Sequence, residues 1–95
     1  MRYEWDEHKR LANLKKHGID FEDAIAIFEG PVLERIDDRK NYGEVRYIVI
    51  GKMIDIELVL VYTPRGDPRR LISARRANRN ERKAYQAHLG ATEEG

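Results

Sequence analysis

The chain has 95 residues, of which 37% are charged, with a formal net charge of +1 and no cysteine. This length fits one domain, and the lack of thiols excludes disulfide bridges, thiolate metal sites and a cysteine nucleophile. There is no apolar run long enough to span a membrane and no apolar signal-peptide core, so we expect a single cytoplasmic domain. Residues 1–89 are expected to form its ordered core and residues 90–95 a flexible tail.

Two helices are predicted in the first third of the chain. The first follows Asp6, a suitable cap, and ends at Gly18, where a left-handed residue would stop it. Leu11 and Leu14 give this helix a thin apolar stripe. The second helix follows Asp20 as its cap. Its apolar residues share one face at i, i+3, i+4 and i+7: Phe21, Ala24, Ile25 and Phe28.

Four strands are predicted to follow. Residues 32–37 are short and mixed, as in an edge strand. Residues 45–51 and 57–63 are rich in β-branched and aromatic side chains, and a turn near Asp55 separates them. Residues 69–77 form the fourth strand. Short connections between consecutive strands predict antiparallel pairing.

A last helix begins at Asn78, which with Glu81 has the spacing of a capping box. The order is therefore helix, helix, four strands, helix. It predicts an α+β fold in which a small antiparallel sheet of about four strands packs against two N-terminal helices and one C-terminal helix.

The charges are unevenly distributed. Residues 20–38 carry seven acids and one base, whereas residues 65–83 carry eight bases and two acids. Arginine dominates the basic block, and its guanidinium group donates to phosphate in a planar, bidentate way. The two blocks indicate two different partners, with phosphates on the partner of the basic block, unless the charges only solvate opposite faces.

Several side chains in and beside the predicted elements could carry chemistry. Strict alternation puts the side chains of residues 69, 71, 73, 75 and 77 on one face of the fourth strand. Arg75 would then either pair with Glu44 or Glu81 or bind a phosphate. Glu44 and Arg46, two residues apart on one strand face, either pair or place an acid–base group beside a phosphate anchor.

The first helix ends in Lys15, Lys16 and His17. These residues complement the helix dipole, and His17 can also exchange a proton near neutral pH. No pair of histidines has the spacing of metal ligands, so we expect neither a metal site nor a cofactor.

Several segments together carry a family resemblance. They are Trp5 to Phe28, with KHG followed by FEDA, Tyr42 to Arg46 (YGEVR), Ile50 and Gly51, Tyr62 and Thr63, and Leu71 to Tyr85 (LISARRANRNERKAY). In order and spacing they resemble the BrnT family of bacterial toxins, which belongs to the RelE-like group of small ribonucleases from type II toxin–antitoxin systems. The resemblance covers nearly the whole chain.

The resemblance implies a toxin that cleaves RNA as an endoribonuclease and inhibits translation and growth. It implies a BrnA-like antitoxin with a ribbon-helix-helix part, which neutralises the toxin in a heterotetramer and alone contacts operator DNA. It also implies the RelE-like arrangement of a small antiparallel sheet with two helices before it and one after. A catalytically inert nucleic-acid-binding or co-repressor protein that acts only with its antitoxin is the alternative.

The resemblance also implies roles for individual residues. RNA supplies its own nucleophile, the 2′-OH, so cleavage needs a base, cations and an acid but no metal. His17 or Glu44 is the candidate base, and Arg75 and Arg46 would stabilise the charge on phosphorus. Lys16 would assist them or donate a proton, and Tyr85 would stack on a base or orient a phosphate. The arginines expected to bind RNA are Arg65, Arg69, Arg70, Arg76 and Arg79.

Overall fold

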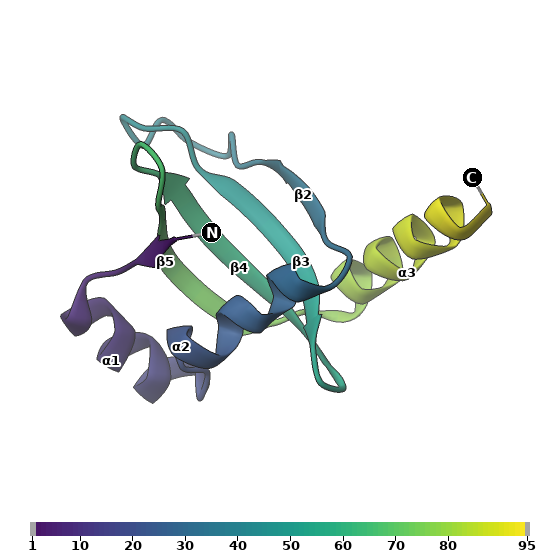
Figure 1. The fold of residues 1–95 in the computed structure, drawn as a ribbon, viewed down its shortest axis with the longest axis horizontal. Helices are drawn as coiled ribbons and strands as arrows, with labels where there is room; N and C mark the ends of the chain where they lie inside the picture. Colours follow the sequence, from purple (N-terminus) through teal and green to yellow (C-terminus); the bar gives the residue numbers. More distant parts are fainter. Residues whose placement is uncertain (1, 95) are drawn as a thin grey trace.

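The computed structural model describes residues 2–94, which form one five-stranded mixed sheet with helices packed on both of its faces (Figure 1). In chain order the elements are β1 (Tyr3–Glu4), α1 (Glu7–His17), α2 (Phe21–Ala24), the 3-10 helix η1 (Ile25–Glu29), β2 (Leu33–Ile36), β3 (Tyr47–Met53), β4 (Ile56–Pro64), β5 (Arg69–Arg76) and α3 (Arg79–Glu94). The strand order across the sheet is β1-β5-β4-β3-β2. The α+β class and the order of the long elements are as predicted.

The prediction of four antiparallel strands is wrong by one strand. Strands β2 to β5 are antiparallel neighbours, but β1 adds a fifth strand that pairs with β5 in parallel. Tyr3 lies opposite Arg69 and Glu4 opposite Arg70. A strand of two residues shows no alternation of its own, so the sequence pattern could not reveal it.

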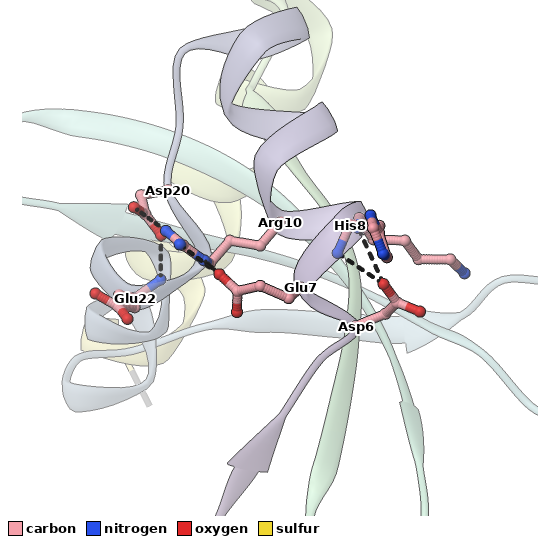
Figure 2. A network of polar contacts seen from close by, with 7 residues as sticks. Asp6, Glu7, His8, Arg10, Asp20 and Glu22 are labelled. Carbon is pink, nitrogen blue, oxygen red and sulfur yellow. Dashed lines mark hydrogen bonds and ion pairs between the residues drawn. The ribbon is translucent and has the colours of Figure 1, made fainter.

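The first two helices begin at the predicted caps, and an ion-pair network joins them (Figure 2). Asp6 accepts hydrogen bonds from two amides of the first turn of α1 at 2.8 and 3.3 Å, and these bonds lower its pKa. Asp20 caps α2 in the same way, and Gly18 ends α1 with φ 72°. Arg10 is bound to Glu7 on its own helix and lies 2.9 Å from Asp20. This arrangement fixes the angle between the two helices.

The buried side of α1 differs from the predicted apolar stripe. Leu11 and Leu14 are 52% and 38% exposed, whereas Asn13 is buried. The Asn13 amide donates to the carbonyls of Ile19 and Ala74, both at 2.9 Å, and accepts from the amide of Ala74 at 3.1 Å. Strand β1 covers only the first part of the β5 edge. Beyond its end, the Asn13 side chain of α1 takes the place of a neighbouring strand.

The second predicted helix is an α-helical turn that tightens into the 3-10 helix η1. The residues that it buries completely follow the three-residue period of a 3-10 helix: Phe21, Ala24 and Ile27. Ile25 and Phe28, which the α-helical period predicted, are only partly buried. Gly51 of β3 permits this close approach, because a Cβ atom there would lie 2.7 Å from Ile27 Cβ.

The sheet has two unlike faces. Helix α1, α2 and η1 cover the first, the α1–α2 face, over a core that includes Phe21, Val49, Leu58, Leu60, Tyr62, Leu71 and Ala74. The other face is named the α3 face. Helix α3 crosses only one end of it and then extends away from the sheet (Figure 1). The smaller core there consists of Ile50, Val59, Ala77 and Tyr85.

Helix α3 runs from Arg79 to Glu94. Asn78 and Glu81 form the predicted capping box, with both side-chain-to-amide hydrogen bonds at 2.8 Å. None of the helices in residues 2–94 is both long and apolar enough to cross a membrane.

Candidate functional site

A β-bulge in β5 decides which arginines share a face. Val61 lies opposite Ser73 and Tyr62 opposite Leu71, so Ile72 is an extra residue in β5. The bulge reverses the alternation, and the predicted face assignment is therefore wrong. Leu71 and Ala74 lie together in the core of the α1–α2 face. Ser73 and Arg75 instead lie on the α3 face.

Arg75 is held by the first turn of α3. Its two terminal nitrogens donate to the two carboxylate oxygens of Glu81, each at 2.8 Å. This pair raises the pKa of Arg75 and lowers that of Glu81. Of the two partners considered from the sequence, Glu81 is thus the actual one. The Arg75 side chain is still 37% exposed, so its guanidinium group can be reached from solvent.

Two further guanidinium groups lie close to this pair. The positive charge of Arg35 contributes to the lowered pKa of Glu81, and that of Arg39 acts on Arg75. Both arginines line a hollow of about 250 Å³ whose wall includes Ile48. Arg35 lies opposite Ile48 in the sheet, which places it on the α3 face. Arg35, Arg39 and Arg75 therefore surround the part of the α3 face beside α3.

The β2–β3 loop is built on one buried carboxylate, that of Asp37, whose side chain is 1% exposed. Arg39 donates to its two oxygens at 2.7 and 2.9 Å, and the Tyr42 hydroxyl donates to it at 3.1 Å. These hydrogen bonds hold the pKa of Asp37 well below its usual range. Arg46 stacks on the Tyr42 ring at 4.1 Å and pairs with Glu44 at 3.0 Å.

Sequence reasoning missed the roles of Asp37, Arg39 and Tyr42, because Arg39 and Tyr42 lie in a polar segment between two predicted strands. No spacing in the sequence signals that an aspartate at the end of a strand will be buried. The spacing of Glu44 and Arg46 allowed either an ion pair or an acid–base group beside a phosphate anchor. In the structure the two side chains form the ion pair.

The end of α1 forms a second hollow at the edge of β5. It is shallow, measures about 280 Å³ and is lined by Lys9, Ala12, Asn13, Lys16, His17, Ile72 and Ser73. Lys16 is exposed and His17 is half-buried. Ser73 also belongs to the row of the α3 face that contains Val61. The hollow at α1 therefore adjoins the α3 face at Ser73.

The comparison with protein families identifies the chain at this point. The family described as "Ribonuclease toxin, BrnT, of type II toxin-antitoxin system" matches residues 5–81, most of the chain. The chain belongs to the BrnT family. A search of curated proteins finds no match. The matched region runs from Trp5 to Glu81, so it includes strands β2 to β5 and the carboxylate that binds Arg75.

In this BrnT chain, the other predicted site residues do not form one surface. Tyr85 is 1% exposed, and its hydroxyl donates to the carbonyl of Pro31 at 2.8 Å. Burial raises its pKa. Tyr85 is therefore a core residue, and the expected contact with RNA finds no support in this geometry.

The arginines expected to bind RNA are divided between the two faces of this BrnT chain. Arg69 lies on the α1–α2 face, 4.1 Å from the centre of the Phe28 ring. Arg70 pairs with Glu4 at 2.5 Å, opposite Thr63. The other three are exposed: Arg65 in the β4–β5 loop, Arg76 at the end of β5 and Arg79 at the start of α3.

Proposed function

We propose that this toxin is an endoribonuclease that cleaves RNA on the α3 face, between the three arginines Arg35, Arg39 and Arg75 and the hollow at the end of α1. The observation that carries the proposal is the gathering of these guanidinium groups around the part of the sheet that α3 leaves free. Membership in a family of ribonuclease toxins supports it.

The proposed reaction is attack of a ribose 2′-oxygen on the adjacent phosphorus, without a metal. A base takes the 2′-OH proton, the P–O5′ bond breaks, and an acid protonates the leaving 5′-oxygen. The products are a 2′,3′-cyclic phosphate and a 5′-hydroxyl. Guanidinium groups stabilise the charge that develops on the phosphoryl oxygens, and they act most strongly where water is partly excluded.

The arrangement favours His17 over Glu44 as the base. Glu44 is already paired with Arg46 at 3.0 Å. If Glu44 took up a proton as the base, Arg46, which stacks on Tyr42, would lose its carboxylate partner. His17 lies in the hollow that meets the α3 face at Ser73, and an imidazole is the side chain that most often serves as a general base. Lys16, in the same hollow, is proposed to protonate the leaving group or bind the phosphate.

Arg46 and Arg75 are proposed to bind the phosphate, with Arg39 as a third donor that the sequence did not indicate. Arg70 would have to exchange its partner Glu4 of β1 for a phosphate, and Arg65, Arg76 and Arg79 are left for more distant phosphates. RNA cleavage inside the bacterial cytoplasm would inhibit translation and growth. A BrnA-like antitoxin with a ribbon-helix-helix part would neutralise the toxin in a heterotetramer and carry it to operator DNA.

One observation favours a second candidate, an inert co-repressor that acts only with its antitoxin. Arg75 and Arg46 both have carboxylate partners within the chain, at 2.8 and 3.0 Å. A phosphate must compete with these carboxylates, and a protein with no need to bind RNA could keep the same pairs for stability.

The test is incubation of antitoxin-free toxin with RNA in EDTA, followed by analysis of the ends. We expect cleavage that leaves cyclic phosphate and 5′-hydroxyl ends and falls by about 10²–10³ in Arg75→Ala, the usual cost of one electrostatic donor. His17→Ala should fall similarly, whereas Tyr85→Phe should keep its activity because its hydroxyl faces Pro31. If RNA stays intact both with the isolated toxin and when translating ribosomes are added, the result would favour the inert co-repressor over the endoribonuclease.

A further inference from the structure

The tip of the β3–β4 hairpin carries an isoleucine in an unfavourable backbone conformation. Strand β3 ends at Met53 and β4 begins at Ile56, so Ile54 and Asp55 form a two-residue turn. Ile54 has φ 57°, and no other non-glycine residue in the described part of the chain has a positive φ. Glycine or asparagine normally occupies such a turn position, because a β-branched side chain is strained there.

The side chain of Ile54 gains nothing from burial to offset this strain. It is 86% exposed, more than any other exposed large apolar side chain in residues 2–94. Glycine at this position would relieve the backbone and remove apolar surface from water. The reason for an isoleucine is therefore to be sought outside the folded monomer.

Ile54 stands beside a hollow of suitable chemistry for a partner. The hollow measures about 460 Å³ and is lined by Glu22, Asp23, Ala26, Met53 and Ile54, which we name the hairpin-tip surface. Its lining contains two carboxylates and no base. The Asp23 carboxylate has no hydrogen-bond or ion-pair partner among the residues that the structure describes. The surface thus combines an apolar anchor with two negative charges, of which that of Glu22 also acts on Arg10.

We propose that the hairpin-tip surface is where the antitoxin docks, through a segment that carries an apolar side chain flanked by lysine or arginine. A type II toxin implies an antitoxin partner, and the chemistry of the surface selects a basic, amphipathic segment of it. A contiguous exposed apolar surface with a polar rim marks such a site, and Ile54 is continuous here with Met53 and Ala26 in the lining of the hollow.

The position of this surface separates it from the cations of the β2–β3 loop and, by the face of the sheet, from Arg75. The hairpin tip and the β2–β3 loop, with Glu44 and Arg46, lie at opposite ends of the sheet (Figure 1). Met53 packs with the core of the α1–α2 face, away from Arg75. Binding here can therefore be measured without RNA cleavage. The inference rests on the partner that the family implies, and it stands or falls independently of the catalytic proposal.

The experiment measures the affinity of toxin variants for the antitoxin encoded with the toxin, by calorimetric titration without RNA. Ile54→Gly should raise the melting temperature of the free toxin and raise the Kd for the antitoxin at least tenfold. The double variant Glu22→Gln, Asp23→Asn should raise the Kd and flatten its dependence on salt. Leu11→Gln, which removes an exposed leucine from α1, is the matched control and should bind as the wild type does.

Two results would overturn the inference. One is an antitoxin Kd for folded Ile54→Gly within twofold of the wild-type value. The other is free toxin that light scattering shows to be a dimer and that Ile54→Gly turns into a monomer, since the surface would then join two copies of this chain. Failure of the RNA cleavage assay would contradict the proposed reaction and leave these binding results unaffected.

Discussion

Asp37 organises the β2–β3 loop although its neighbours in the sequence gave no sign of it. Its buried carboxylate receives Arg39 in a bidentate pair and also the hydroxyl of Tyr42, whose ring supports Arg46. Ion pairs on the surface contribute little to stability, but a buried carboxylate whose oxygens are all hydrogen-bonded is costly to disturb. One residue therefore sets the positions of two cations of the proposed site.

The stability contributed by Asp37 should depend on pH. Because hydrogen bonds from Arg39 hold its folded-state pKa below the unfolded value, the contribution is present above the ordinary pKa of about 4 and is lost as pH falls through the folded-state pKa. Asp37→Asn should lower the unfolding free energy by about 2 kcal/mol at pH 7. The difference from wild type should shrink below about pH 4. Urea unfolding of wild type and Asp37→Asn at pH 7 and pH 3 measures this difference in unfolding free energy.

The exposed neighbour Asp38 supplies the control, and Asp38→Asn should leave the unfolding free energy nearly unchanged at both pH values. A difference between wild type and Asp37→Asn that is equal at pH 7 and pH 3 would contradict the role assigned to the carboxylate.

At the scale of single residues, the sequence predicted the interactions between residues that are close together in the chain. Asp6, Asp20 and the Asn78–Glu81 box are caps, and a cap is recognised within four positions of the chain. Asn13 escaped prediction, because its partner Ala74 is 61 positions away. In the same way, the burial of Tyr85 depends on the carbonyl of Pro31, which belongs to a distant loop.

The type and order of the long helices and strands were predicted correctly, but which of their residues face the core was predicted only in part. The long strands and helices have the predicted order, but η1 changes the helical period from 3.6 to about 3, and the bulge at Ile72 reverses the faces of β5. Both departures occur where elements must fit each other: Ile27 against Gly51, and β5 against the longer β4. Local patterns carry no information on such fits, and this is why the face of Arg75 was assigned wrongly.

The contact of η1 with β3 predicts opposite effects for two glycine substitutions. Gly51→Ala should lower the unfolding free energy by about 1–3 kcal/mol, because its Cβ would overlap Ile27 Cβ at 2.7 Å in a packed core. Gly90→Ala in α3 should raise it by about 0.5–1 kcal/mol, because no atom lies within 4 Å of the added Cβ and alanine favours the helix. Chemical denaturation of both variants measures these changes in unfolding free energy. A Gly51→Ala variant more stable than wild type would show that η1 does not pack on β3 as described.

For the molecule as a whole, the distribution of charge matters more than its near-zero sum. Arg39, Arg46 and Arg75 are each paired with a carboxylate of the same chain, so phosphate binding by them is an exchange of partners. Glu81 is the most informative of these carboxylates because it joins the sheet to α3 and caps that helix at once.

This exchange predicts how RNA binding depends on salt. The logarithm of affinity for single-stranded RNA should fall with the logarithm of salt concentration by about 0.7 per phosphate contact. Arg75→Ala and Arg39→Ala should each reduce that slope by about 0.7, while Arg69→Ala, on the opposite face, should not. Glu81→Gln should raise the affinity, since glutamine can still cap α3 while Arg75 is released. Equal slopes for all variants, measured by fluorescence anisotropy, would move RNA binding away from the α3 face.

The amide of Asn13 has a consequence for how copies of this chain behave in a crowded cell. An unpaired strand edge is a template on which another chain can add a strand, and repeated addition yields fibrous aggregates. Asn13 occupies both backbone groups of Ala74 with its own amide, so that stretch of β5 offers no place for a second molecule. A single side chain thus blocks this stretch of the edge, as a covering helix or loop does in other sheets. Helix α1 determines both where His17 lies and whether another chain can pair with this stretch of β5.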